Sequence, residues 1–397
     1  MAKRRGAGEG TIYERKNSGK NSKWVAEAFI GYDPKTGKPK RKAFYFRTRA
    51  EAAAKLHEIL PKIKNGTYSE PSKQLFADWL DSWLNNYMKP SLRATTWESY
   101  FYLINKHIKP TLGHLRLNQI TTAHLQKLYN EKQKDGSRAD GKEGGLSART
   151  VRYIHVVIHG ALEQAKKEGT ILINPSDNVK LPREQKKEIK YFSIDDISKF
   201  IEAAQETSWF PAYFLELATG LRRGELLALR WKDIDLEHGT VTVNQNLVRV
   251  KGGLKFQEPK TKLANRTISI PPKVTDELKS HRKRQAEAKL LAGAAYEDQD
   301  LVFCNELGGP SCPRAISRHF ERLLKKAGLP QITFHGLRHT YATMSLQQGV
   351  DIKTTQENLG HYKAAFTLDV YSNVTAKMKQ EATDKIGNLL ASCLDNK

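Results

Sequence analysis

Residues His335-Gly336-Leu337-Arg338-His339-Thr340, followed by Leu359-Gly360-His361 and then by Tyr371, form the stretch around which the C-terminal part of the chain is organised. His335 and Arg338 lie three residues apart, which places both on one face of a helix. The stretch therefore presents a cation, two imidazoles and a phenol from one segment. Whether these groups meet around a phosphate decides what the segment does.

The residues between these groups predict short helices that would hold them. Leu337, Tyr341 and Met344 recur with a helical period, so they form a stripe that faces the core. Gly349 is placed to end this helix, and Gly360 to end the next one, which Asp351 would cap. The segment is therefore expected to be compact and all-helical.

Composition limits what the chain can be. It has 397 residues, which suggests two or three domains, and 66 Lys and Arg against 43 Asp and Glu give a net charge of +23. Such a field attracts a polyanion, and nucleic acid is the first candidate. An anionic membrane is less suitable as a partner, because the sequence offers neither an apolar amphipathic anchor nor an apolar run of spanning length.

The start of the chain and its cysteines indicate a location. Charges at the N-terminus are not followed by a hydrophobic stretch, so no secretory signal is expected. Cys304, Cys312 and Cys393 are too few for a disulfide framework or a four-thiolate metal site. We therefore expect a reducing, cytoplasmic environment.

Residues 1–65 are predicted to be a small basic module of three strands and one helix. The strand-like segments are 11–15, 23–32 and 40–46, with a hairpin turn between the last two. Thr48 and Glu51 form a capping box that opens a helix through about Leu60, where Pro61 is expected to interrupt it.

This module carries a surplus of positive charge, with 17 Lys and Arg against 7 Asp and Glu in residues 1–70. A basic three-stranded sheet backed by one helix can lay its strands in a major groove of DNA. The alternative is a solvated sheet without a ligand. Aromatic and basic residues that interleave across the strands favour DNA binding; they are Trp24, Lys40, Arg41, Lys42 and Tyr45.

Two further domains are predicted after a linker. Residues 73–180 read as four or five amphipathic helices, and residues 190–397 as a mostly helical domain with a small antiparallel sheet. In the helical domain, Arg149 and Arg152 on the polar side of a helix capped by Ser147 either contact phosphates or are simply solvated. The fold class is therefore mainly α with small β-sheets, in several domains.

The last domain contains a second group of notable residues. Strands 239–248 and 266–270 flank a turn that holds Lys260 and Lys262, and an amphipathic helix is expected from Thr375 onward. Arg222, in the sequence Thr-Gly-Leu-Arg, opens a helix, where its planar fork is suited to bind two phosphate oxygens. Taken alone, such an arginine is more often structural, and a lone lysine in a turn is usually just exposed.

The joint order of these motifs resembles the tyrosine recombinase (phage-type integrase) family, and is closest to integrases of conjugative transposons. The resemblance is carried by Thr-Gly-Leu-Arg-x-x-Glu, a lysine in a turn between strands, His-x-x-Arg-His, Leu-Gly-His and a tyrosine ten residues later. It implies an arm-type DNA-binding domain at 1–65, a core-binding domain at 73–180 and a catalytic domain at 190–397. Lys260 is preferred to Lys262 as the family's lysine, because it precedes a threonine.

The resemblance implies a mechanism of DNA cleavage and religation that needs no metal and no cofactor. Tyr371 would attack DNA to give a 3′-phosphotyrosyl bond, and Arg222 and Arg338 would neutralise the charge on the phosphate. His335 and Lys260 would share proton transfer, with Lys260 as the acid. His361 would bond the phosphate or position the tyrosine, and Glu225 would hold the helix that carries Arg222.

The implied function is that of an integrase that inserts and excises a mobile element such as a conjugative transposon or prophage. Its partners would be double-stranded DNA at core-type and arm-type sites, three further copies of the chain held through the C-terminal helix, and an excisionase or a host DNA-bending protein. A bacterial, nucleoid-associated location follows. The alternatives are an accessory DNA-binding protein with a degenerate site and an enzyme similar to type IB topoisomerases.

Overall fold

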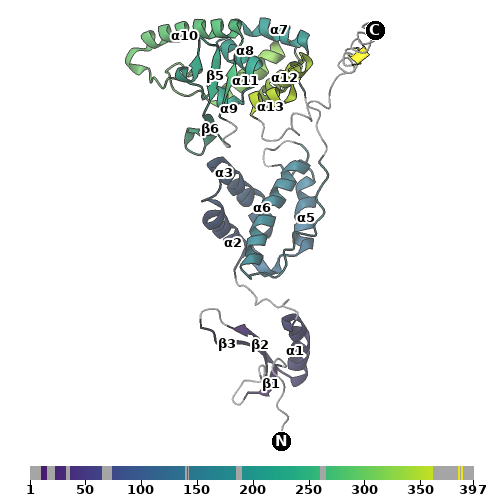
Figure 1. Cartoon of the computed structure of the whole chain (residues 1–397). Coiled ribbons are helices and arrows are strands. Elements are labelled where there is room, and N and C mark those ends of the chain that lie inside the picture. Colours follow the sequence, from purple (N-terminus) through teal and green to yellow (C-terminus); the bar gives the residue numbers. More distant parts are fainter. Residues whose placement is uncertain are drawn as a thin grey trace, which may run out of the picture. The chain divides into compact units, whose positions relative to one another are not determined.

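The computed structural model describes residues 10–15, 23–32, 36–64, 74–138, 141, 143–184, 190–259, 265–360, 383–384 and 386–387. The chain divides into two compact units, residues 1–185 and 186–397 (Figure 1). The expected domain boundaries, at 1–65, 73–180 and 190–397, remain a prediction. Within the described ranges no helix has the length and apolar character needed to cross a membrane.

An antiparallel sheet and one helix form the beginning of the first unit, which we call the N-terminal module. Its elements are β1 (Thr11–Glu14), β2 (Trp24–Tyr32), β3 (Pro39–Phe46) and α1 (Arg49–Lys64). The strands pair in the order β1-β2-β3, and small residues of β2 leave room for the helix to pack closely. Ala26 and Ala28 of the sheet meet Ala52, Leu56 and Ile59 of α1 in the core.

The start of α1 is as predicted, but its end is not. Glu51 accepts hydrogen bonds from the Arg47 and Thr48 amides and donates its own amide to the Thr48 hydroxyl, which is the expected capping box. The helix then continues through Pro61 to Lys64, so the prediction of an interruption at Pro61 is wrong. Proline removes one backbone hydrogen bond, and here it does so only in the last turn, where few bonds remain to be lost.

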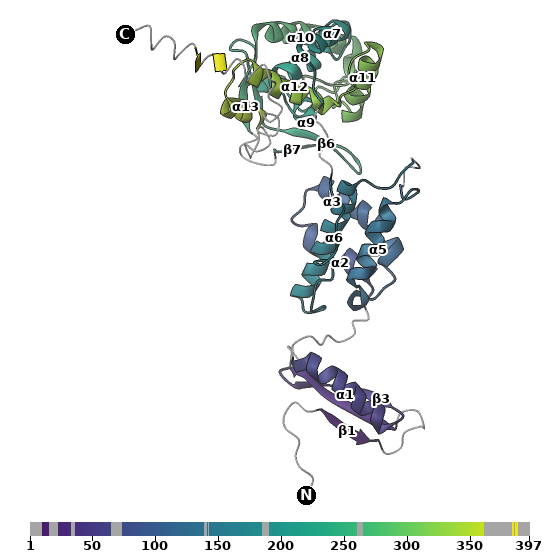
Figure 2. The ribbon, with the colours of Figure 1, turned by 90° about the vertical axis from the view of Figure 1, so that its right-hand side faces the viewer.

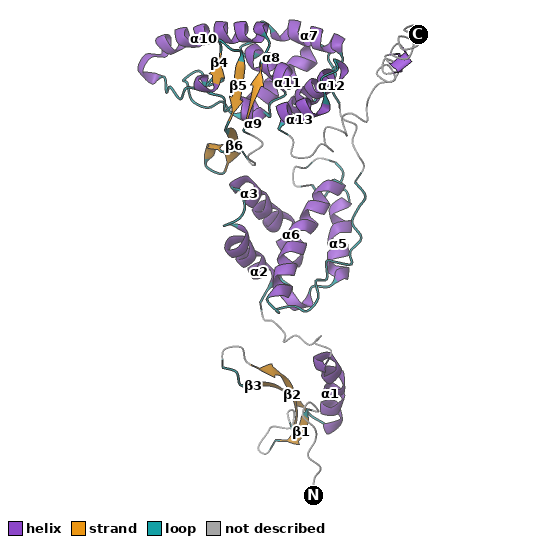
Figure 3. Cartoon of the chain, in the orientation of Figure 1, coloured by secondary structure: helices purple, strands orange, loops and turns teal. Residues whose placement is uncertain are grey.

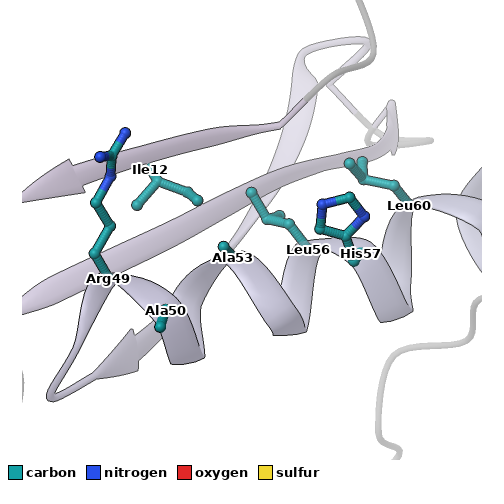
Figure 4. Close-up of a pocket in the computed structure, with 7 residues that line it drawn as sticks. All are labelled: Ile12, Arg49, Ala50, Ala53, Leu56, His57 and Leu60. Carbon is teal, nitrogen blue, oxygen red and sulfur yellow. The ribbon is translucent and has the colours of Figure 1, made fainter.

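A groove runs between β1 and one face of α1 (Figure 4). Ile12 of β1 lies opposite a face of α1 that is made of small and apolar side chains, with Arg49 at one end. The lining residues are Ile12, Arg49, Ala50, Ala53, Leu56, His57 and Leu60. The groove exists because Ala50 and Ala53 are too short to fill the space between the helix and the strand.

The rest of the first unit is helical, as predicted, and we call it the helical module. Its elements are α2 (Phe76–Ser82), η1 (Trp83–Met88), α3 (Ala94–Leu103), η2 (Ile104–Ile108), α4 (Lys109–Leu112), η3 (Leu117–Gln119), α5 (Thr122–Gln133) and α6 (Ala148–Lys167). The Trp79 indole donates to the Ala161 carbonyl at 2.8 Å and ties α2 to α6. The Ser147 hydroxyl caps α6 by accepting from the Thr150 amide at 3.2 Å, as expected.

The second unit, residues 186–397, is mostly helical with small sheets (Figure 3). Its helices are α7 (Ile194–Ala204), α8 (Phe210–Thr219), α9 (Arg223–Leu226), η4 (Trp231–Asp233), α10 (Pro272–Ala292), η6 (Gly293–Ala295), α11 (Pro313–Lys326), α12 (Phe334–Gln347) and α13 (Ile352–Leu359). Helix α8 contacts α7, α10 and α12. Aromatic rings of Phe200, Tyr213, Phe320 and Phe334 join four helices at its core.

The strands of this unit differ in part from the prediction. They are β4 (Ile234–Asp235), β5 (Thr240–Val243), β6 (Asn246–Val250), β7 (Gly253–Gln257) and β8 (Arg266–Ser269). The predicted pairing of the two flanking segments is confirmed for β5 and β8, which join β4 in one sheet. The segment 239–248 is not one strand, however, because β6 leaves this sheet and pairs with β7, which the sequence did not predict.

The predicted C-terminal helix from Thr375 onward lies outside the described residues, apart from 383–384 and 386–387. The two helices around the opening stretch are confirmed as α12 and α13. Leu337 and Tyr341 are buried, and the Asp351 carboxylate caps α13 by accepting from the Thr354 amide at 2.9 Å. Gly360 ends α13 with a positive φ of 62°.

Candidate active site

The site begins at the turn that joins α8 to α9. Gly220 ends α8 in the left-handed conformation, with φ of 60° and ψ of 32°. A Cβ atom at this position would lie 2.5 Å from the Tyr341 ring and 2.8 Å from the Leu359 side chain, so only glycine fits. The close approach brings the turn against α12 and the end of α13, and Arg222 follows two residues later.

Arg222 lies at the N-terminus of α9 and remains in contact with solvent. Its Nη1 donates to Glu225 Oε1 at 2.6 Å, and its Nη2 donates to the Gly360 carbonyl at 3.0 Å. The side chain is 39% exposed. The guanidinium is therefore fixed on two sides by the protein and accessible on the remaining side, which is the condition for binding an anion from solution.

Arg338 is held from the other direction and is almost completely buried, with 2% exposure. From α12, its Nη1 donates to the Gly220 carbonyl and its Nη2 to the Leu359 carbonyl, both at 2.6 Å. Burial, followed by the charge of Arg222, lowers the pKa of Arg338 to about 9, so the group stays positive at neutral pH. Arg338 thus fastens the α8–α9 turn to the end of α13.

Arg222 and Arg338, which we call the arginine pair, meet at one short segment. Their Nη2 atoms bind the carbonyls of Gly360 and Leu359, which are consecutive residues. The sequence motifs that contain the two arginines lie more than a hundred residues apart, and the fold brings them together. The roles expected of the two arginines at a phosphate remain predictions.

His335 lies one turn before Arg338 on α12, with its side chain exposed. Its ring is 5.0 Å from that of His339, measured between centroids. Desolvation against the protein surface, followed by the positive charges of His339, Arg338, Arg222 and Arg223, lowers the pKa of His335 to about 4. The imidazole is therefore neutral at pH 7 and able to accept a proton.

Glu225 lies between two arginines beneath this surface, with a side chain that is 4% exposed. Its Oε2 accepts from the Arg222 amide at 3.1 Å and from Arg266 Nη2 at 2.9 Å. Burial acts to raise the pKa of Glu225, but the charge and hydrogen bond of Arg266 and then the charge of Arg222 outweigh it and lower the pKa. The carboxylate is therefore ionised and holds Arg222 in place.

Two residues of this network were missed by the sequence analysis. Arg266, at the start of β8, is 7% exposed on its side chain and contacts Glu225. Glu216 of α8 is fully buried, and neither of its carboxyl oxygens has a hydrogen-bond partner within the part of the chain that the structure describes. Neither lies in a recognisable motif. The sequence could have shown them only as charged residues at helix or strand positions where the hydrophobic pattern predicts a buried side chain.

Four predicted residues of the site lie outside the described residues: Lys260, Lys262, His361 and Tyr371. Their roles remain predictions. Gly360, which Arg222 binds, directly precedes His361 in the chain.

The residues predicted to bind DNA in the N-terminal module fall on two faces of its sheet. Trp24 packs with the core beneath α1, and Lys42 pairs with the buried Ala28 on that same face. Arg41 and Tyr45 lie on the opposite face, because they pair with Phe29 and Val25 and a strand alternates its side chains. The aromatic and basic residues that interleave across the strands therefore lie on both faces of the sheet.

On this open face the guanidinium of Arg15 lies 5.9 Å from the Tyr45 ring centroid. Tyr45 is 55% exposed. Arg41 is exposed and makes a long ion pair, at 3.9 Å, with Glu27. Lys40 is exposed at the start of β3, near the irregularity in its pairing with β2. The prediction of DNA contact stays a prediction, and it fits Arg41 and Tyr45 better than Trp24.

In the helical module, Arg149 and Arg152 are exposed on α6, as expected. Arg152 Nη1 donates to the Pro182 carbonyl at 3.1 Å. This acceptor is neutral, so the contact does not neutralise the positive charge of Arg152. Contact of these arginines with phosphates stays a prediction.

The site as described is suited to bind and polarise a phosphate group. It offers a partly exposed guanidinium, a second buried guanidinium and a neutral imidazole, with an ionised carboxylate below them. Among the described residues there is no group of three His, Cys, Asp or Glu side chains able to hold a metal ion.

Comparison with known proteins finds matching family models and relatives for this chain. The model of the Phage integrase family matches residues 190–378, and that of the Phage integrase, N-terminal SAM-like domain matches residues 75–133. A tyrosine recombinase XerC-like protein of Caldanaerobacter subterraneus subsp. tengcongensis is 33% identical over 379 residues, covering 91% of this chain and 94% of that protein. The ICEBs1 integrase of Bacillus subtilis is 27% identical, covering 93% and 98%.

Solved structures show the same fold. The integrase of the Tn1549 transposon, in complex with a circular intermediate DNA, has a TM-score of 0.67 at 20% identity, over 79% of this chain and all of that chain. A lambda integrase dimer bound to a core site has a TM-score of 0.55 at 22% identity, over 90% and 93%. With a third of its residues identical to a tyrosine recombinase over nearly its full length, the chain belongs to the phage integrase family of tyrosine recombinases.

Proposed function

We propose that this tyrosine recombinase cuts and rejoins DNA at specific sites, through a 3′-phosphotyrosyl bond to Tyr371, to integrate and excise a mobile element such as a conjugative transposon or prophage. The observation that carries the proposal is the meeting of Arg222 and Arg338 at the Leu359 and Gly360 carbonyls, immediately before His361 in the chain. This arrangement concentrates positive charge where the family places the phosphate to be cut.

The arginine pair would neutralise the phosphate as it is attacked. A phosphodiester carries one negative charge, and more charge develops on its nonbridging oxygens in the transition state. Arg222 is accessible enough to bind these oxygens, with the planar geometry that suits them. Arg338 contributes its charge from below and keeps the turn in place. Loss of one such preorganised donor typically slows the reaction about 100- to 1000-fold.

Proton transfer would involve His335 and Lys260. His335, whose imidazole is neutral in the DNA-free protein, would take a proton from the attacking tyrosine. Lys260 would give a proton to the leaving 5′-oxygen, as the family resemblance implies. His361 would bond the phosphate or position the tyrosine. Glu225 would act by holding Arg222.

Tyr371 would be the nucleophile. A phenol with a pKa of about 10 is a weak nucleophile at neutral pH and needs positive charge and a proton acceptor nearby. The covalent bond preserves the energy of the phosphodiester, so the strand can be rejoined without a nucleotide cofactor. This chemistry requires no metal ion, and the reaction should continue in an excess of chelator.

DNA would be bound by all parts of the chain. We infer arm-type sites for the N-terminal module, through Arg41 and Tyr45 on its open face, and core-type sites for the helical module, through Arg149 and Arg152. Helix α11 also lines a groove with three cations and one carboxylate, Arg318, Arg322, Lys325 and Glu321, which extends to Thr333 at the start of α12. We infer that these cations contact the DNA backbone.

Assembly and location follow from the same proposal. A lambda integrase of the same fold has been solved as a tetramer bound to a Holliday junction, with a TM-score of 0.53. We propose that this chain also acts as a tetramer on DNA, joined through its C-terminal segment. An excisionase or a host DNA-bending protein would set direction, and the protein would act on nucleoid DNA in the bacterial cytoplasm.

Trapping the covalent adduct tests the proposal. A duplex that spans the joined ends of the mobile element, nicked next to the cleavage position, should accumulate protein linked to DNA because the short product strand diffuses away. Tyr371→Phe should abolish the adduct, while Tyr362→Phe, a matched change in the same segment, should not. An adduct that persists in Tyr371→Phe would assign the nucleophile to another residue, and loss of the adduct in EDTA would indicate a metal-dependent enzyme.

A further inference from the structure

Arg266 lies in no motif that the sequence analysis identified, yet it contacts two elements of the site. It is the first residue of β8, six residues after Lys260, and its side chain is 7% exposed. A buried guanidinium is costly to desolvate, so it persists where several acceptors hold it in one orientation. Two such acceptors are visible, and they belong to two different elements.

The first acceptor is Glu225. Arg266 Nη2 lies 2.9 Å from Glu225 Oε2, while Glu225 Oε1 receives Arg222 Nη1 at 2.6 Å. The carboxylate thus stands between the two guanidiniums, and its orientation determines where Arg222 points. Without Arg266, the remaining contacts of Glu225 described above would all be to Arg222, and the carboxylate would be free to turn with it.

The second acceptor lies at the end of α13. Arg266 Nε donates to the Asn358 carbonyl at 2.6 Å. The side chain also packs against Gly360, because a Cβ atom there would lie 3.0 Å from Arg266 Nη1. Arg222 binds the Gly360 carbonyl, so Arg266 supports both the carboxylate and the backbone segment to which Arg222 is attached.

We propose that Arg266 is a positioning residue for the phosphate site: it orients the Arg222 guanidinium through Glu225 and the α13 terminus, without touching DNA itself. The exposed fractions of the two side chains support these separate roles: Arg222, which would bind the phosphate, is 39% exposed, and Arg266, which would position Arg222, is 7% exposed. Lysine cannot replace Arg266, because one ammonium on a flexible stem does not reproduce a planar fork that donates from Nε and Nη2 at once. The inference rests on the proposed role of Arg222 in binding the phosphate.

The test measures single-turnover formation of the covalent adduct with two nicked duplexes that differ at the cleavage position. One carries the normal phosphate and the other an uncharged methylphosphonate, which does not need a cation to neutralise it. The variants are Arg266→Gln, Arg266→Lys, Arg222→Gln and, as a matched control, Arg284→Gln, which removes an arginine paired with Glu277 at 2.6 Å on the surface of α10.

With the phosphate duplex we expect both Arg266 variants to be slower than the wild type by about 100-fold, the loss typical of a misplaced catalytic group. With methylphosphonate the loss should shrink to a few-fold, in parallel with Arg222→Gln, while Arg284→Gln should match the wild type on both. Arg266→Lys keeps the positive charge beside Glu225, so it still tests the inference if Arg266→Gln fails to fold.

Two outcomes overturn the inference. An equal loss on both duplexes would mean that Arg266 does not act through the charge on the phosphate. Full activity of Arg266→Lys would mean that a positive charge suffices and that the two directed bonds do not matter. Failure of the proposed function is distinct: the wild type would form no adduct, or Arg222→Gln would react with phosphate as fast as the wild type.

Discussion

At the scale of single residues, the site depends on charges whose ionisation the fold controls. Glu225 is kept ionised by Arg266 and Arg222, while His335 is kept neutral first by desolvation and then by the positive charges around it. Sequence motifs predicted Arg222, Glu225, His335 and Arg338 as a set, because their spacing is the family's pattern. Arg266 and Glu216 could not be predicted, since their importance comes from contacts between elements that only the fold creates.

The pKa of His335 gives the first prediction. Its value of about 4 lies below the usual 6.5, so the neutral form is favoured on folding. This contribution to stability is present above pH 6.5 and is lost as the pH falls through 4. In an NMR titration of the DNA-free protein the His335 resonance should shift below pH 5. The resonance of His238 should shift above pH 6.5, because the hydrogen bond to Asp235 raises the pKa of His238. Titration of His335 near 6.5 would show that neither desolvation nor the surrounding positive charges lower its pKa.

Glu216 gives a prediction of opposite sign. Burial first, and then repulsion by Glu225, raises the pKa of this carboxyl well above its usual value, against the attraction of Arg338 and Arg266. The contribution of Glu216 to stability should be greatest below pH 4.5, where this group is protonated in both the folded and the unfolded protein, and should decline as the pH rises toward the raised pKa. Glu216→Gln, which keeps the shape without the charge, should remove this decline.

Thermal midpoints of the wild type and Glu216→Gln at pH 5 and pH 8 provide the measurement. The variant should gain relative to the wild type at pH 8, and the gap should narrow at pH 5. A wild type that is the more stable protein at pH 8 would indicate that Glu216 is ionised and paired with Arg338, contrary to the burial argument.

At the scale of elements, caps and turns were the best predicted features, because their signals are local. The Thr48–Glu51 capping box and the caps at Ser147 and Asp351 are all present. Pro61 and the β6–β7 hairpin were mispredicted for a different reason. Proline near a helix end costs little, and the alternation of residues 239–248 continues through the point where the chain changes sheet, so the pattern carries no mark of the change.

The turn at Gly220 supplies a test at this scale. Gly220→Ala would place a Cβ in the left-handed region and 2.5 Å from the Tyr341 ring, whereas Gly349→Ala meets the same backbone strain, at φ of 82°, with nothing within 4 Å. Both should lose about 1 kcal/mol from strain. Gly220→Ala should lose about 1 to 3 kcal/mol more from overpacking.

Urea denaturation of the two glycine variants, together with their rates of adduct formation, checks this prediction. Gly220→Ala should also react slowly, since the Gly220 carbonyl accepts from Arg338. Equal effects of the two substitutions on stability and rate would mean that the packing of the α8–α9 turn against α12 is not what holds the site together.

At the scale of the whole molecule, charge and modular construction determine how DNA is bound. A chain with a net charge of +23 that contacts several phosphates should lose affinity steeply with salt, by about 10³ to 10⁵ between 50 and 200 mM for six to ten contacts. Titration of fluorescent DNA at several salt concentrations measures this slope. A nearly flat dependence would contradict binding through the backbone phosphates.

The separate roles of the modules give a second prediction at this scale. Removal of residues 1–65 should spare adduct formation on the core duplex and abolish binding to arm-type flanking DNA. In the full chain, Arg41→Gln should weaken arm binding and reduce its salt slope by about one. Arg49→Gln, a matched arginine that lines the α1 groove away from the open face, should leave it unchanged. Loss of core cleavage on removal of 1–65 would mean that the modules are assigned wrongly.

The most direct test of the central claim is to identify the atom that becomes linked to DNA. The trapped adduct is digested with protease and nuclease, and the modified peptide is sequenced by mass spectrometry. We predict a single nucleotide attached through its 3′-phosphate to the phenol oxygen of Tyr371. Attachment to any other residue, or through a 5′-phosphate, would contradict the account.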